Sequence, residues 1–144
     1  MPQGPIIIGY DGSAASERAV TDAGVLFGQR KALVVTVWEA GAGFAVVATP
    51  TIPPAPIDFR LAIEYEEALY EGARQLAEHG ARLAIDAGLD AQSLAVADES
   101  SVPESLVRIA TECDAACLAV GSHGHRALRE VLMGTTTRQV IQHA

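Results

Sequence analysis

The chain has 144 residues, of which 49% are apolar and 19% charged, and its formal net charge is −8. The acidic balance argues against an electrostatic grip on DNA or RNA, because phosphate binding of that kind needs a basic patch. No apolar run reaches the roughly 18 residues of a membrane span, and the first residues lack the basic and apolar regions of a signal peptide. We therefore expect one cytoplasmic domain over residues 1–144 that binds neither nucleic acid nor membrane.

The first predicted elements are a strand, a helix and a second strand. Residues 6–10 are a short apolar, β-branched run closed by Asp11-Gly12-Ser13, which is typical of a buried strand followed by a turn. Ser13 suits a helix N-cap, because its hydroxyl can accept a hydrogen bond from an unpaired N–H of the first turn. The helix is expected to run to about Gln29, and residues 32–38 predict the second strand.

Residues 40–57 differ from the rest of the chain. They hold two glycines and four prolines, which break regular structure throughout. A loop of this length in a compact domain is either functional or mobile. A lid over a site and a loosely ordered connection both remain open.

The second half continues the alternation of strands and helices. A long helix is expected over residues 58–87, with Gly88 at its C-cap. Ser101-Val-Pro-Glu104 fits a capping box with proline in the first turn. The other predicted elements are a strand at residues 91–97, a helix from Ser101 to about Cys113, a strand at residues 115–120 and a last helix from Thr135 to His143.

The two cysteines, Cys113 and Cys117, fall at a predicted helix end and inside a predicted strand. With no other cysteine in the chain, neither a zinc site nor a disulfide framework is indicated. We expect both to be small buried hydrophobic residues.

The order of the elements predicts an α/β fold. Strands that alternate with helices of ten or more residues imply an open, parallel, twisted sheet with helices on both faces, flavodoxin-like or Rossmann-like. In such sheets ligands bind beyond the carboxyl ends of the strands, where the strand order reverses. Strands one and four would flank that point, so Asp11 and Gly121, which follow them, are expected to converge.

A glycine-rich segment, Gly121 to Thr137, follows the fourth strand. Glycine lets the backbone approach an anion closely, and the first N–H groups of a helix are unpaired at the positive end of its dipole. Gly134 is placed at such a helix start, and the threonines after it add hydroxyls. The segment therefore predicts a phosphate site, although it is neither a Walker A loop nor a dinucleotide motif.

Four residues of this segment match the pattern G-x2-G-x9-G-[ST], namely Gly121, Gly124, Gly134 and Thr135. Together with the opening stretch Ile6–Ser13, they make the chain resemble the universal stress protein family in its ATP-binding branch. The resemblance covers nearly the whole chain. It implies an adenine nucleotide alpha hydrolase-like fold, bound ATP with Mg²⁺ held through the phosphates, a homodimer, and a role in stress response.

The resemblance also implies which residues hold the nucleotide. By this resemblance, Asp11 would lie against the ribose and adenine, and Val37 would pair with the adenine edge through its backbone. Gly121 and Gly124 would wrap the ribose and phosphates, and Gly134 with Thr135 and Thr136 would hold the outer phosphates. For Arg126, contact with a phosphate and simple solvation both remain open. The implied nucleotide-binding residues are Asp11, Val37, Gly121, Gly124, Arg126, Gly134, Thr135 and Thr136.

The chain departs from the family pattern at its end. Relatives continue past the last helix into a fifth strand, whereas this chain stops at Ala144. We therefore expect the fifth strand to be missing. Its absence would leave the fourth strand as an exposed edge and would put in doubt a dimer built through the fifth.

Three functions remain in view. The first is an ATP-binding regulatory protein. The second is a slow ATPase or autophosphorylating enzyme, for which Asp11, His123, His125 and Arg126 are the only plausible local helpers. The third is a protein-interaction module that keeps its glycines for packing, since tight turns at strand ends also favour glycine. No residue is assigned a catalytic role, and no metal site on protein ligands is predicted.

Overall fold

The computed structural model describes residues 4–48, 56, 58–98, 101–121 and 140–143. Within these ranges, five strands form one sheet in the order β3-β2-β1-β4-β5, with every neighbouring pair parallel. This order reverses between β1 and β4, as in a Rossmann sheet. The predicted α/β fold with an open parallel sheet is confirmed. The strands are β1 (Ile6–Gly9), β2 (Lys31–Glu39), β3 (Asp90–Asp98), β4 (Cys117–Gly121) and β5 (Val140–His143).

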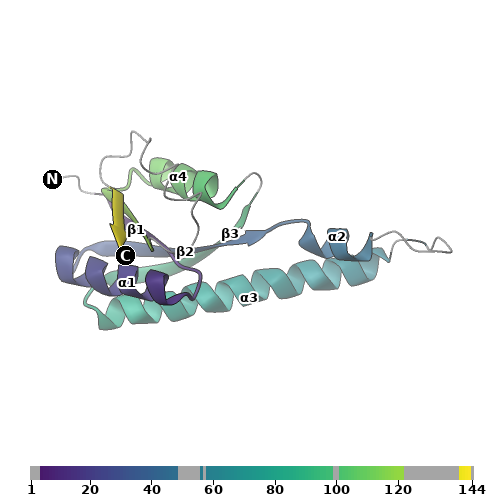
Figure 1. Ribbon diagram of the computed structural model, residues 1–144, viewed down its shortest axis with the longest axis horizontal. Coiled ribbons are helices and arrows are strands. Elements are labelled where there is room, and N and C mark those ends of the chain that lie inside the picture. The colour runs from purple at the N-terminus through teal and green to yellow at the C-terminus, as the bar shows by residue number, and fades with distance from the viewer. Residues whose placement is uncertain (1–3, 49–55, 57, 99–100, 122–139, 144) are drawn as a thin grey trace.

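Helices cover both faces of the sheet. In Figure 1, α1 and α3 lie on one face and α4 lies on the other. The N-terminal part of α3 extends past the sheet, and α2 lies beside it. Among the described residues, no helix combines the length and the apolar character needed to cross a membrane. The helices are α1 (Ala14–Phe27), α2 (Ala42–Val47), α3 (Phe59–Asp86) and α4 (Val102–Glu112).

The apolar core is split into two layers by the sheet. Ile6 and Ile8 of β1 pack in the layer beneath α1 and α3, whereas Ile7 packs in the layer beneath α4. Successive side chains of a strand point to opposite faces, so a continuous isoleucine run supplies both layers. All three side chains are fully buried. The near-continuous apolar strands in the sequence are explained by this two-sided burial.

The starts of α1 and α4 and the end of α3 form where the sequence predicts them. The hydroxyl of Ser13 accepts a hydrogen bond from the Ser16 N–H at 3.1 Å, and Ser101 caps α4 through the N–H of Glu104. Gly88 follows α3 with φ of +107° and donates to the carbonyl of Ile85. This left-handed residue is the glycine that closes a Schellman motif, which confirms the predicted stop.

The end of the chain corrects two predictions. Residues 140–143 form strand β5, which pairs with β4 from Leu118–Val140 to Gly121–His143, so the predicted helix is wrong there and the fifth strand is present. Residues 135–139 lie outside the described residues. Val140 and Ile141 are β-branched and fit a strand better than a helix end. The edge strand on this side of the sheet is therefore β5, and β4 lies between β1 and β5.

The segment 40–57 also differs from its prediction. Residues 42–47 form the short helix α2, capped by Gly41 with φ of +87°. No proline falls between Gly41 and Pro50, so nothing prevents a helical turn in this stretch. The N–H of Gly41 donates to the Glu66 carboxylate of α3 at 3.1 Å, which ties the start of α2 to the long helix.

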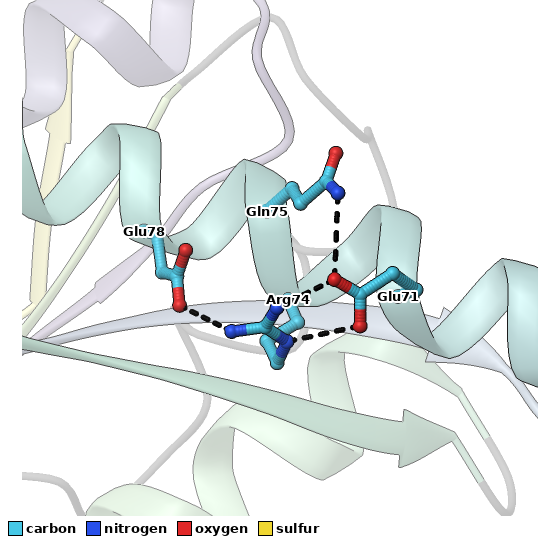
Figure 2. Close-up of polar contacts among 4 residues, drawn as sticks. All are labelled: Glu71, Arg74, Gln75 and Glu78. Carbon is cyan, nitrogen blue, oxygen red and sulfur yellow. Dashed lines mark hydrogen bonds and ion pairs between the residues drawn. The ribbon is translucent and has the colours of Figure 1, made fainter.

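A cluster of ion pairs lies along α3. Figure 2 shows the guanidinium of Arg74 bonded to both carboxylate oxygens of Glu71 and to Glu78, while Gln75 donates to Glu71. The bonds to Arg74 hold the pKa of the Glu71 carboxyl below its ordinary value. Pairs three and four residues apart support a helix modestly when they face solvent, as these do. We therefore assign this cluster to the support of the long helix.

The two cysteines lie in different environments. Cys117 is fully buried in β4, and burial raises its pKa to about 11. Cys113 is the C-cap of α4 and is exposed, so the prediction of two buried cysteines is wrong for this one. A helix end that faces solvent leaves its cap residue uncovered, which the apolar character of cysteine does not reveal.

The raised pKa of Cys117 predicts a loss of stability in alkaline solution. The unfolded thiol titrates near 9.0 and the folded one near 11, so the stabilisation is complete below pH 9 and disappears as the pH rises toward 11. The expected loss between pH 8 and pH 10.5 is about 2 kcal/mol, out of about 3 kcal/mol for the full shift. Urea unfolding at pH 8 and at pH 10.5 measures it. The Cys117→Ala variant should lose less over the same interval, and equal losses in both proteins would contradict this assignment.

Candidate functional site

A cleft opens at the carboxyl ends of the central strands, where the sheet order reverses. Its empty space, including the part open to solvent, is about 440 Å³. Strands β1, β2 and β4, the start of α1 and the first turns of α4 all contribute. The lining residues are Gly9, Tyr10, Asp11, Ser16, Val35, Val37, Val102, Leu106, Val120 and Gly121.

The walls of the cleft are mainly apolar. Val35 and Val120 come from the sheet and Leu106 from α4, and each is 1% exposed. Val37 and Val102 lie nearer the mouth and are half-buried. Two facing aliphatic surfaces of this kind suit a flat, apolar ring, because both faces of the ring are then removed from water at once.

The backbone of Val37 is turned toward the cleft. The carbonyl of Val35 accepts a hydrogen bond from the Tyr10 N–H at 2.9 Å, so the polar groups of Val35 face β1. Alternate residues of a strand direct these groups to the same side, and Val37 is two residues further along. Because β1 ends at Gly9, opposite Val35, the N–H and C=O of Val37 point past the end of that strand. They can serve as a donor and an acceptor for the edge of a ring.

A polar network fixes the mouth of the cleft at the start of α1. The Asp11 carboxylate accepts a hydrogen bond from the Ser13 N–H at 2.9 Å, which closes an Asx turn. The Ser16 hydroxyl donates to the Ser13 carbonyl at 2.9 Å and accepts from the Asp11 N–H at 3.4 Å. These bonds hold an exposed carboxylate in one orientation at the edge of an apolar cleft.

Gly121, at the end of β4, is packed tightly against α1. A Cβ at this position would lie 2.6 Å from the carbonyl carbon of Ala15 and 2.8 Å from both the oxygen and the Cβ of the same residue. The absence of a side chain is therefore required by the approach of β4 to α1. The sequence left both the approach of a ligand and packing open as reasons for this glycine, and the contact with Ala15 supplies the packing reason.

The structure brings three of the eight predicted site residues together. Asp11, Val37 and Gly121 line the same cleft, although they lie far apart in the sequence. Whether they bind a ligand stays a prediction. Within the described ranges, no group of three or more histidine, cysteine, aspartate or glutamate residues is arranged to hold a metal ion. The other predicted site residues, which lie outside the described residues, are Gly124, Arg126, Gly134, Thr135 and Thr136.

Several lining residues were not predicted from the sequence. Ser16 lies three residues after the predicted N-cap Ser13, and this spacing was the available signal for a polar contact there. Val102 and Leu106 lie on α4 four residues apart, which marks an apolar helix face but does not indicate that the face borders a cleft. Their role at the site follows only from the packing of α4 on the sheet.

Comparisons with known proteins agree with this architecture. A model of the universal stress protein family matches residues 4–144. A search of curated proteins found no match. Among solved structures, the hypothetical protein MJ0577 is similar over 100% of this chain and 99% of its own, with a TM-score of 0.72 and 17% identity.

Two further solved structures carry nucleotides. A universal stress protein from Archaeoglobus fulgidus, in complex with dAMP, is 18% identical, with 99% of this chain and 98% of that chain covered and a TM-score of 0.60. A universal stress protein in complex with cAMP is 20% identical, with 100% and 99% covered and a TM-score of 0.64. At these identities the similarity establishes the fold, and the ligands belong to those proteins.

Proposed function

The chain belongs to the universal stress protein family, and we propose that it is a regulatory protein that binds ATP with Mg²⁺ in the cleft where β1 and β4 diverge. The observation that carries the proposal is the convergence of Asp11, Val37 and Gly121 on one cleft with apolar walls. Nucleotide binding would change the conformation, stability or partners of the protein. The role in stress response, like the homodimer, is the expectation that the family supplies.

The apolar part of the cleft is the proposed place of the adenine base. The base would lie between the β2 side, at Val37, and the α4 side, at Leu106. The outward N–H and C=O of Val37 match the alternating donors and acceptors on an adenine edge. The base of dAMP and of cAMP in the two related complexes is also adenine, which supports this choice of ligand.

Asp11 is the proposed ribose contact. A carboxylate has two oxygens and about four lone pairs, so it can accept hydrogen bonds from ribose hydroxyls as well as from the Ser13 N–H. Hydrogen bonds to an ionised acceptor are stronger than neutral ones. Asp11 lies at the mouth of the cleft, two residues after β1, and this position supports a contact with the ribose of a base bound deeper in the cleft.

The segment after β4 is the proposed phosphate site. The chain as a whole is acidic, but residues 122–139 contain three arginines and a single acidic residue, Glu130. Arg126, Gly134 and the threonines that follow it supply charge, accessible backbone and hydroxyls of the kind that polyphosphates need. When bound, Mg²⁺ neutralises part of the phosphate charge and is held largely by phosphate oxygens and water.

Thermal unfolding with and without ligand tests this function. ATP with Mg²⁺ at 100 times its dissociation constant should stabilise the fold by about 2.7 kcal/mol. For a domain of this size, the melting temperature should rise by about 5 to 10 °C. Inorganic tripolyphosphate with Mg²⁺ is the matched control for charge alone and should give a much smaller shift. No shift with ATP at millimolar concentration would contradict the proposal, as would equal shifts with ATP and tripolyphosphate.

A further inference from the structure

Gly9, the last residue of β1, lies at the floor of the cleft. A Cβ at this position would lie 2.9 Å from Cδ1 of Leu106 and 3.3 Å from Cγ1 of Val120. Both of those side chains are 1% exposed. These side chains therefore already fill the space beside the Gly9 backbone, and a side chain at this position would have to displace them.

The backbone does not explain why this position is glycine. Gly9 is not among the described glycines with positive φ, so other residues could adopt its conformation. The ladder with β2 continues in register from Ile6 to Gly9, so there is no bulge. Glycine weakens a strand, and where neither φ nor a bulge requires it, it marks close approach of a ligand or another backbone. The nearest neighbours here are the Leu106 and Val120 side chains of the cleft wall, not another backbone, so the glycine is what allows this wall to pack against β1.

We propose that Gly9 is the specificity-determining residue of the cleft, with Leu106 as the residue that limits its depth. This inference rests on the proposed function, because it assumes that the cleft holds the nucleobase. Because Gly9 has no side chain, Leu106 can pack back against β1, which keeps the cleft wide enough for a bicyclic purine. A methyl group there would push Leu106 toward the cleft, because the surrounding core is close-packed and the cleft is the open side.

Calorimetric titration of Gly9→Ala with ATP and Mg²⁺ tests the inference. The affinity is expected to fall at least tenfold relative to the wild type. Gly72→Ala is the matched control, because Gly72 is exposed on α3 and a Cβ there would meet nothing within 4 Å. Its affinity should equal that of the wild type. Undiminished binding by Gly9→Ala would overturn the inference.

A rescue variant separates loss of space from general damage. In the Gly9→Ala background, Leu106→Val shortens the side chain that faces the new methyl group. The double variant is expected to recover ATP affinity to within about threefold of the wild type, which a merely distorted fold would not do. Failure to recover, with melting temperatures of both variants close to that of the wild type, would overturn the inference.

A third variant keeps the inference testable if Gly9→Ala does not fold. Leu106→Ala alone deepens the cleft, so it should narrow the difference in affinity between ATP and 1,N6-etheno-ATP, whose base carries a third ring. An unchanged ratio would overturn the inference. If the wild type binds no adenine nucleotide, the proposed function fails, and the inference about Gly9 fails with it. Binding by the wild type with no effect of these variants leaves the function standing and removes only the role of Gly9.

Discussion

Replacing Gly121 with alanine is expected to destabilise the fold by about 3 kcal/mol. The new Cβ would lie 2.6 Å from the carbonyl carbon of Ala15, and backbone atoms cannot move aside as the end of a side chain can. Either α1 shifts away from β4 or β4 leaves its register with its neighbours. The free energy of unfolding in urea, with and without the substitution, measures the effect.

The same chemical change at Gly72 is the control for this prediction. Gly72 is exposed within α3, where alanine should stabilise the fold by about 0.5 to 1 kcal/mol. The two glycine-to-alanine variants are therefore expected to change stability in opposite directions. A cost below about 1 kcal/mol at Gly121 would contradict the packing at the β4–α1 contact. Because this glycine supports the fold, loss of ligand binding in its variants would not identify a ligand contact.

Replacing Asp11 with asparagine is expected to weaken ATP binding by roughly 10- to 100-fold, the range expected for a lost charged hydrogen bond. Asparagine retains one side-chain oxygen, which can still accept the Ser13 N–H and keep the Asx turn. It loses the charge and the second oxygen that we assign to the ribose. The melting temperature of the ligand-free protein should stay within a few degrees of that of the wild type, while calorimetry reports the loss of affinity.

A ligand without ribose hydroxyls completes this test. The wild type should bind 2′,3′-dideoxy-ATP about as weakly as the Asp11→Asn variant binds ATP. The substitution should then weaken the binding of dideoxy-ATP little further. This non-additivity is the signature of a direct contact between the carboxylate and the ribose. If Asp11→Asn weakens ATP and dideoxy-ATP by the same factor, the ribose contact is excluded.

The fold could be predicted largely because local signals agree with the tertiary structure. The Ser13 and Ser101 caps and the stop at Gly88 come from side-chain chemistry and φ preferences that act within a few residues. The last strand and α2 were not predicted. Val140–His143 is stabilised as a strand by pairing with β4, which lies about twenty residues earlier, and a short segment carries too little pattern to reveal such a partner.

The candidate site could be predicted in part for a similar reason. Asp11 and Gly121 follow strands whose carboxyl ends must meet in a parallel sheet, so their convergence follows from topology alone. Leu106 and Gly9 depend on which face of α4 packs over which strand. The sequence shows that α4 has an apolar face, but the close packing of Leu106 against Gly9, where a Cβ would lie 2.9 Å from Leu106 Cδ1, emerges only in three dimensions.

The most direct test of the proposed function is a crystal structure of the protein grown with excess ATP and Mg²⁺. We expect the adenine ring between Val37 and Leu106, its edge on the backbone of Val37, and the ribose within hydrogen-bonding distance of the Asp11 carboxylate. Nucleotide bound at another surface, or a cleft without nucleotide at concentrations that saturate binding in solution, would contradict the assignment of this cleft.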